Sequence, residues 1–261
     1  MLHTPRKRFG QNFLHDPGII EKIVAAIRPR PGERLVEIGP GQGAITLPLL
    51  KVAGSLTVIE LDRDLIQPLQ NRCRTAGDLT VHNTDALRFD FCSLADDAGL
   101  RIIGNLPYNI STPLLFHLLD QSRCISDMHF MLQKEVVERM AASPGNGQYG
   151  RLSVMLQYRC KVYPLFTIGP GAFTPPPKVD SAFVRLVPFI RPPVNIADEA
   201  VFATLVRQAF AQRRKTLRNS LRDLLDADEI RLAGVDPAAR AETLDLEAFA
   251  ALANRAARYG L

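Results

Sequence analysis

A glycine-rich turn between a strand-like segment and a helix-like segment constrains this sequence most. Residues 34–38 are mostly apolar and run into Glu37-Ile38-Gly39-Pro40-Gly41-Gln42-Gly43-Ala44, after which residues 44–52 have helical spacing. Glycines carry no Cβ, so a ligand can approach the backbone amides where the helix begins. The alternative is a tight turn that binds nothing. The pattern favours an α/β fold with a ligand at this turn.

Short apolar segments and segments of helical period alternate from about residue 20 to residue 140. This alternation is typical of βαβ units around a parallel sheet. We expect strands at residues 34–38, 56–61, 79–83, 101–105 and 128–133, and helices at residues 19–27, 44–52, 63–74, 112–119 and 135–142. Residues 149–159 have helical period, and residues 181–187 alternate as a strand does, which predicts an antiparallel addition to the sheet edge.

A domain boundary is expected near residue 191, because residues 189–194 read Phe-Ile-Arg-Pro-Pro-Val and resemble a linker. The sequence beyond it is rich in Ala, Leu and Arg and helical in period. We therefore expect a catalytic domain of residues 1–190, with a basic N-terminal arm at 1–15, and a small all-α domain of residues 191–261.

Composition excludes several classes of protein. The chain has 261 residues, a formal net charge of +5 and four cysteines spaced by 19, 32 and 36 residues, so no Cys-x-x-Cys pair predicts a metal site. We expect four reduced thiols and no metal. The N-terminus does not resemble a signal or transit peptide, and no stretch approaches the ~20 apolar residues of a membrane span. We expect a cytoplasmic protein without membrane contact, and a monomer, because nothing requires a partner subunit.

Two acidic residues extend the ligand hypothesis. Glu60 closes the next predicted strand, 21 residues after Gly39, where a carboxylate can accept both hydroxyls of an adenosine ribose. Asp85 follows the third strand, where it can meet the exocyclic amine of an adenine, although a surface Asp that caps a loop is the alternative. A dinucleotide and S-adenosylmethionine both remain open here, because Gly39-x-Gly41-x-x-Ala44 also satisfies the dinucleotide fingerprint.

The motif Asn105-Leu106-Pro107-Tyr108 at the end of the fourth predicted strand decides between them. Methylation of an aromatic amine requires that its conjugated lone pair be localised, which acceptors for the N–H protons can do. The Asn105 side-chain oxygen and the Leu106 carbonyl are two such acceptors, Pro107 stiffens their placement, and Tyr108 offers a ring for stacking. A dehydrogenase has no use for this motif, so S-adenosylmethionine is favoured.

The sequence closely resembles the KsgA family of small-subunit ribosomal RNA adenine dimethyltransferases. Five stretches carry the resemblance: Arg6 to Leu14, Glu37 to Gly43, Gly104 to Pro113, Gly147 to Ser153, and Phe173 to Ser181 with its three consecutive prolines. Arg213-Arg214-Lys215-Thr216-Leu217-Arg218-Asn219 extends the match, which covers roughly residues 3–222. We matched no motif in residues 223–261.

The resemblance implies a class I (Rossmann-like) methyltransferase fold that converts S-adenosylmethionine to S-adenosylhomocysteine. The implied reaction places four methyl groups on two adjacent adenines in the 3′-terminal hairpin of 16S rRNA, with the immature small subunit as partner. The implied donor-binding residues are Asn12, Leu14, Gly39, Gly41, Glu60, Asp85 and Asn105. Tyr108 and Phe173 would sandwich a flipped base. A Phe before three prolines can instead anchor a loop through its hydrophobic ring.

Two clusters of basic residues predict contact with RNA. Residues 205–222 contain no acidic residue, so cations there lack helical ion-pair partners and are expected to meet phosphates. The expected contact residues are Arg6, Lys7, Arg8, Arg213, Arg214, Lys215 and Arg218. An ordinary solvated helix face, or a disordered basic tail at the N-terminus, is the simpler alternative.

Two rival functions remain from the sequence. The chain could methylate adenine in large-subunit rRNA, as erythromycin-resistance methyltransferases do, or in DNA. It could also be a non-catalytic RNA-binding assembly factor on the same fold, although Asn105, Tyr108 and Glu60 are all present.

Overall fold

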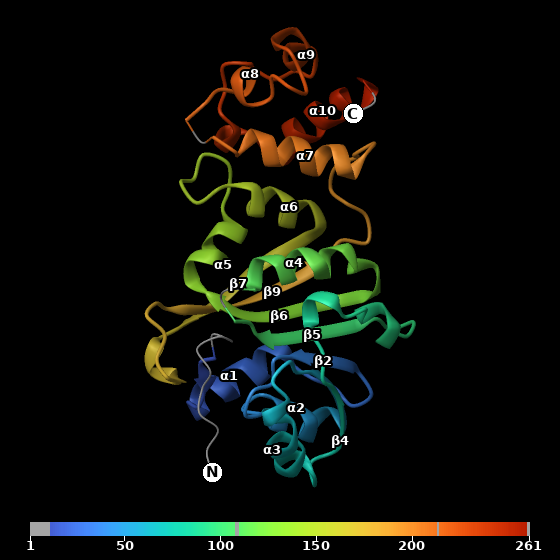
Figure 1. Cartoon of the computed structure of the whole chain (residues 1–261), viewed down its shortest axis with the longest axis vertical. Helices are drawn as coiled ribbons and strands as arrows, with labels where there is room; N and C mark the ends of the chain where they lie inside the picture. Colours follow the sequence, from blue (N-terminus) through green and yellow to red (C-terminus); the bar gives the residue numbers. More distant parts are fainter. Residues whose placement is uncertain (1–10, 108–109, 213, 260–261) are drawn as a thin grey trace. The chain divides into compact units, whose positions relative to one another are not determined.

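The computed structural model describes residues 11–107, 110–212 and 214–259, and these form two compact units (Figure 1). The first contains the chain up to Val137 together with Tyr163–Pro188, and the second contains Glu138–Val162 together with the chain from Phe189 onward. The chain crosses between the units at Pro188 and Phe189, near residue 191, where the domain boundary stays a prediction. Residues 138–162, which we expected in the catalytic domain, group with the second unit.

A seven-stranded sheet forms the centre of the fold, with strand order β4-β3-β2-β5-β6-β9-β7. Neighbouring strands from β4 to β6 are parallel, and β9 is antiparallel to β6. The strands are β2 (Arg34–Ile38), β3 (Ser55–Ile59), β4 (Asp78–His82), β5 (Leu100–Asn105), β6 (Ile125–Gln133), β7 (Cys160–Ile168) and β9 (Ser181–Pro188). Short strands β1 (Phe13–Leu14) and β8 (Phe173–Thr174) pair separately. All five predicted parallel strands and the antiparallel addition are confirmed; β7 was not predicted.

The α-helices follow the predicted spacing closely. They are α1 (Pro17–Ile27), α2 (Thr46–Ala53), α3 (Arg63–Cys73), α4 (Ser111–Asp120), α5 (Lys134–Ala141), α6 (Arg151–Arg159), α7 (Glu199–Ala209), α8 (Leu217–Ser220), α9 (Ala227–Leu232) and α10 (Leu246–Ala256). Short 3-10 turns include η2 (Ala86–Arg88), η3 (Phe91–Leu94) and η4 (Ser122–Cys124). Among the described residues, no helix is both long and apolar enough to cross a bilayer.

Strand order reverses between β2 and β5, which places two sequence motifs side by side. Ile38 at the end of β2 is in register with Gly104, so the glycine turn and Asn105 emerge together. An open parallel sheet binds ligands at this kind of switch point, outside the carboxyl ends of its strands. The register explains why two motifs 66 positions apart lie at one site.

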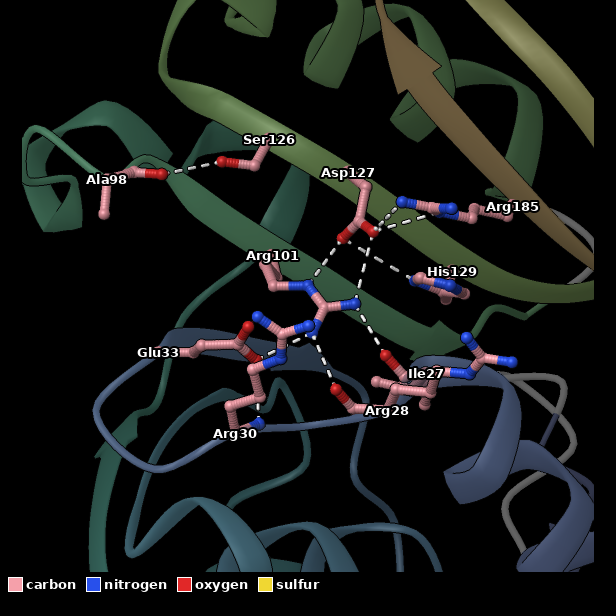
Figure 2. Close-up of polar contacts among 10 residues, drawn as sticks. All are labelled: Ile27, Arg28, Arg30, Glu33, Ala98, Arg101, Ser126, Asp127, His129 and Arg185. Atoms are coloured by element: carbon pink, nitrogen blue, oxygen red, sulfur yellow. Dashed lines mark hydrogen bonds and ion pairs between the residues drawn. The ribbon is translucent and has the colours of Figure 1, made fainter.

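A partly buried ionic network centred on Asp127 ties the amino ends of the central strands to α1 (Figure 2). Arg101 on β5 binds Asp127 on β6 through two hydrogen bonds of 2.9 and 3.2 Å and donates to the main-chain oxygen of Ile27 at 2.7 Å. It also pairs with Glu33, and Arg185 on β9 pairs with Asp127. Burial raises the pKa of Asp127, but these cations outweigh burial and hold the pKa below its usual value. The network fixes α1, whose other end follows the Gln11–Leu14 segment.

The second unit has a hydrophobic core of its own, and it includes part of the segment before β7. Tyr158 of α6 packs on Phe202 of α7 with ring centroids 5.0 Å apart, and Tyr149 packs on Phe210. These contacts explain why residues 138–162 group with the C-terminal helices. Sequence patterning could not reveal this, because the partner residues lie more than 40 positions away.

Two of the four cysteines are not reduced thiols. Cys92 and Cys124 form a disulfide, with their Cα atoms 5.5 Å apart, while Cys73 and Cys160 are free and buried. The prediction of four thiols was therefore wrong for one pair. A separation of 32 residues carries no information on distance, and it is the fold that brings η3 beside η4. Burial raises the pKa of the Cys160 thiol to about 12.

Candidate active site

A cavity of about 350 Å³ opens at the carboxyl ends of the central parallel strands, within the first unit. Five segments supply its wall: the chain just before α1, the glycine turn after β2, the end of β3, the chain after β4, and the chain after β5. The lining residues include Asn12, Leu14, Gly39, Gly41, Glu60, Asp85, Asn105, Leu106 and Pro107. The structure therefore brings the predicted donor-binding residues together.

The glycine turn has the backbone conformation that its sequence predicts. Gly39 and Gly41 have φ values of 65° and 55°, in the left-handed region that side chains rarely adopt. A Cβ on Gly41 would lie 3.1 Å from the Phe13 ring. The α3 side chain of Arg72 donates to the main-chain oxygen of Gln42 at 2.8 Å, which supports the turn from behind. The turn thus lines the cavity with glycine backbone in a fixed shape.

Glu60 presents a carboxylate that the backbone holds in place. Its Oε1 accepts from the amide of Asp62 at 2.7 Å, and its Oε2 accepts from the amide of Gly41 at 3.4 Å. Burial raises the pKa of Glu60 above its ordinary value, while these two backbone hydrogen bonds oppose that rise. Each carboxylate oxygen can accept a further hydrogen bond, so Glu60 fits a diol such as a ribose.

Asp85 also lines the cavity, at the start of η2. Its Oδ1 accepts from the amide of Leu87 at 3.0 Å and so caps this short turn. The cap fixes the side chain, and the carboxylate keeps acceptor capacity for an amine in the cavity. The two alternatives from the sequence are therefore compatible, since one residue both caps the turn and lines the site.

Asn105 lies at the end of β5 with its amide orientation set by a neighbour. Its Nδ2 donates to the main-chain oxygen of Asn12 at 3.1 Å. A carbonyl oxygen only accepts, so this contact turns Oδ1 of Asn105 the other way. The main-chain amide of Leu106 donates to the main-chain oxygen of Met131 on β6, and this hydrogen bond anchors the motif to the sheet. Pro107 lines the cavity. Tyr108 lies outside the described residues.

Comparison with known proteins identifies the family. The family model described as ribosomal RNA adenine dimethylase matches residues 2–258. The chain belongs to the ribosomal RNA adenine dimethylase family. The match extends past residue 222, where the motifs we could find in the sequence ended.

Curated relatives of this dimethylase family member are similar over almost their whole length. The Ribosomal RNA small subunit methyltransferase A of Pseudomonas syringae is 60% identical over 97% of this chain and 94% of its own. That of Pseudomonas aeruginosa is 59% identical over 98% and 96%.

Two solved structures confirm the class I methyltransferase fold. A dimethyladenosine transferase from Plasmodium falciparum has a TM-score of 0.76 and 28% identity, covering 92% of this chain and 95% of its own. The 23S rRNA methyltransferase ErmE has a TM-score of 0.72 and 25% identity, covering 94% and 99%. The fold is thus shared by a dimethyladenosine transferase and a 23S rRNA methyltransferase.

Glu37 is a cavity residue of this dimethylase to which the sequence assigned no role. Its side chain is 2% exposed, and its Oε2 has no hydrogen-bond partner among the described residues. Burial raises the pKa of Glu37 to about 7; the nearby Thr46 hydroxyl opposes the rise, and Glu60 adds to it. A buried polar atom without a partner is costly, so its place in the wall fits a ligand that donates a hydrogen bond. Its position just before the glycines was the available signal.

Phe173 lies in the hydrophobic core and is absent from the cavity wall. It is 3% exposed, sits in β8 opposite Leu14 of β1, and packs in the cluster that contains Phe183. This placement supports the alternative of an anchor for the proline-rich loop. The stacking role for Phe173 stays a prediction.

Three of the seven predicted RNA-contact residues belong to the described part of the chain, and none of the three lines the cavity. Arg214, Lys215 and Arg218 are exposed, between α7 and the end of α8. Arg6, Lys7, Arg8 and Arg213 lie outside the described residues. Their contact with RNA stays a prediction.

Proposed function

We propose that this chain transfers methyl groups from S-adenosylmethionine to the N6 amines of two adjacent adenosines in the 3′-terminal hairpin of 16S rRNA. The observation that carries the proposal is the hydrogen bond that fixes the side-chain amide of Asn105 beside the glycine turn. In this orientation Oδ1 of Asn105 is a hydrogen-bond acceptor where the substrate amine is to be held. The small-subunit names of relatives about 60% identical support 16S rRNA over the large-subunit alternative.

The cavity fits S-adenosylmethionine in the chemistry of its wall. Glu60 suits the ribose hydroxyls, Asp85 suits the adenine amine, and Glu37 and the glycine turn add further polar groups to the wall. Asn12 and Leu14 also line the wall. When bound, the donor supplies an electrophilic methyl group on a sulfonium. We propose that no metal takes part.

The residues of the motif after β5 act on the substrate amine. Oδ1 of Asn105 and the carbonyl of Leu106 accept its N–H protons, which localises the nitrogen lone pair toward the donor. A mono-methylated amine keeps one N–H, so Asn105 can hold it for a second transfer. No strong base is needed, because alignment is the main requirement and the proton leaves to water afterwards.

We further propose that the second unit contacts the immature small ribosomal subunit through Arg214, Lys215 and Arg218, and that the protein acts as a monomer in the cytoplasm. Three exposed cations within five positions support phosphate contact. Sedimentation of the purified chain at micromolar concentration tests the monomer.

The test of the function is methyl transfer from labelled donor to small-subunit particles, large-subunit RNA and duplex DNA, followed by mapping of the labelled base. The proposal expects two adjacent dimethylated adenosines in the small-subunit hairpin alone. Label in large-subunit RNA would favour the erythromycin-resistance alternative. Tight RNA binding without label on any substrate would favour an assembly factor.

A donor-binding measurement completes the test. Glu60→Ala is expected to weaken binding of S-adenosylhomocysteine about 10- to 100-fold, as loss of hydrogen bonds to a charged group does, and to leave RNA affinity unchanged. The control variant is Asp78→Ala. Asp78 is exposed at the start of β4, whereas the cavity lies at the carboxyl ends of the strands. Equal donor affinity in both variants would exclude Glu60 from the donor site.

A further inference from the structure

Contacts among the described residues hold the Gln11–Leu14 segment beside the cavity. Nε2 of Gln11 donates to Oδ2 of Asp62 at 3.2 Å, across 51 positions of sequence. The Phe13 ring lies against Gly41, and Leu14 pairs with β8. The segment therefore forms a wall of the cavity although it precedes the parallel strands in the sequence. The side-chain hydrogen bond from Gln11 to Asp62 is the contact nearest the start of the segment.

Asp62 joins two parts of the donor site. Its main-chain amide donates to Oε1 of Glu60 at 2.7 Å, so its backbone holds the carboxylate assigned to the ribose. Its side chain, in a residue only 2% exposed, caps α3 by accepting from Asp64 and accepts from Gln11 through the other oxygen. The acidic cap lies at a helix N-terminus, where the partial positive charge favours it.

The Gln11 contact also bears on the orientation of the Asn105 amide. Gln11 is bonded directly to Asn12, whose carbonyl turns Nδ2 of Asn105 away from the substrate side. The two orientations of a side-chain amide differ only in which atom meets which partner. If Asn12 moves, Asn105 can flip and present an NH₂ group to the substrate amine, which is itself a donor. A donor facing a donor cannot localise the lone pair.

We propose that Gln11 and Asp62 are positioning residues for methyl transfer. Their hydrogen bond holds the Gln11–Leu14 segment closed against the donor and keeps the Asn12 carbonyl where it orients Asn105. The inference rests on the proposed function for its effect on turnover, but its effect on donor binding is independent of the RNA substrate.

An exchange of charge and amide between the two residues tests this. Gln11→Glu places two carboxylates together and is expected to weaken donor binding and to lower kcat, each about 10- to 100-fold. In Gln11→Glu combined with Asp62→Asn, the new amide can donate to Glu and still cap α3 through its oxygen. The double variant is expected to recover both quantities to within about threefold of wild type.

Matched variants separate positioning from folding. Gln67 on α3 is exposed and also donates through Nε2, to Asn71, so Gln67→Glu makes the same chemical change away from the cavity. Asp16 caps α1, so Asp16→Asn controls for an amide at a helix cap. Both are expected to keep the kcat and donor affinity of wild type, measured with thermal unfolding of every variant.

The outcomes are distinguishable. Rescue by the exchange supports the proposal, because the second substitution restores the hydrogen bond itself, and the unfolding temperatures show whether the stability of the fold changed with it. The proposal is overturned if Gln11→Glu leaves donor affinity and kcat unchanged, or if the double variant is no better than Gln11→Glu. If the wild-type chain methylates none of the nucleic acids tested, the proposed function fails, and S-adenosylhomocysteine binding still decides whether Gln11 and Asp62 hold the cavity wall.

Discussion

The side-chain amide nitrogen of Asn105 lies 3.1 Å from the main-chain oxygen of Asn12, 93 positions earlier in the chain. Because that oxygen can only accept, the contact selects one orientation of the Asn105 amide and leaves Oδ1 as an acceptor. A site built in this way suits a ligand group that donates hydrogen, such as an exocyclic amine.

Asn105→Ala is expected to lower turnover about 10²- to 10³-fold, as loss of one positioned hydrogen-bond partner of the transition state does. Donor affinity is expected to change much less. The measurement is single-turnover methyl transfer to small-subunit particles at saturating donor. Asn71→Ala, at an exposed position on α3, is the control. Turnover equal to wild type would remove Asn105 from the mechanism.

Glu37→Gln is expected to change how stability depends on pH. The folded-state pKa of about 7 lies above the ordinary value of 4.5, so between these values the folded protein holds a proton that the unfolded chain releases. The free energy of unfolding therefore falls as pH rises from 4.5 to 7 and is level above 7. This gap corresponds to about 3 kcal/mol.

Urea unfolding of the donor-free protein from pH 4.5 to 8.5 measures this. The stability of Glu37→Gln relative to wild type should rise by about 3 kcal/mol across the window, while Asp78→Asn should show no comparable trend. A constant difference between Glu37→Gln and wild type would mean that Glu37 ionises at its ordinary pKa.

Gly41→Ala and Gly32→Ala form a matched pair. Both glycines have positive φ, 55° and 82°, so an alanine strains either turn by about 1–2 kcal/mol. Only at Gly41 would the new Cβ meet another side chain, the Phe13 ring at 3.1 Å; at Gly32 nothing lies within 4 Å. Both variants should lose similar stability, and only Gly41→Ala should lose donor affinity in calorimetric titration. If Gly41→Ala and Gly32→Ala bind the donor equally well, the contact between Gly41 and the Phe13 ring does not contribute to donor binding.

Phe173 variants decide between core packing and stacking on a base. Because the ring is buried in the core, Phe173→Ala is expected to cost about 3–5 kcal/mol of stability. Phe173→Leu keeps most of the volume and should cost less than about 1.5 kcal/mol with turnover near wild type. If the ring stacks on the target base, Phe173→Leu should instead lose RNA-dependent turnover while remaining stably folded.

Replacement of Arg214, Lys215 and Arg218 by alanine is expected to flatten the salt dependence of RNA binding. If all three meet phosphate, the slope of log affinity against log salt falls by about 2–3. Alanine at Arg74, Arg88 and Arg123, which are exposed in the first unit, removes the same charge. Equal slopes for the two triple variants would mean that Arg214, Lys215 and Arg218 are merely solvated.

Local pattern was sufficient for the parallel strands and most helices of the first unit. Residues 34–38 were predicted as a strand with the bounds that the structure shows, because apolar periodicity and glycine punctuation act over a few residues. β7 escaped prediction because Tyr163 and Leu165 are exposed while Pro164 interrupts the segment, so no burial pattern marks it.

The sequence by itself determined the chemistry available: the glycine turn, the acids Glu60 and Asp85, and the amide of Asn105 could be listed with their roles before any fold was known. Only the tertiary structure decided which groups meet. Phe173 is buried in the core and pairs with Leu14, Cys92 forms a disulfide with Cys124, and Gln11 donates a hydrogen bond to Asp62. Motifs are encoded by neighbours along the chain. These pairings join residues 32 positions apart for Cys92 and Cys124, 51 for Gln11 and Asp62, and 159 for Leu14 and Phe173, and they arise only when strand order and burial bring distant segments together.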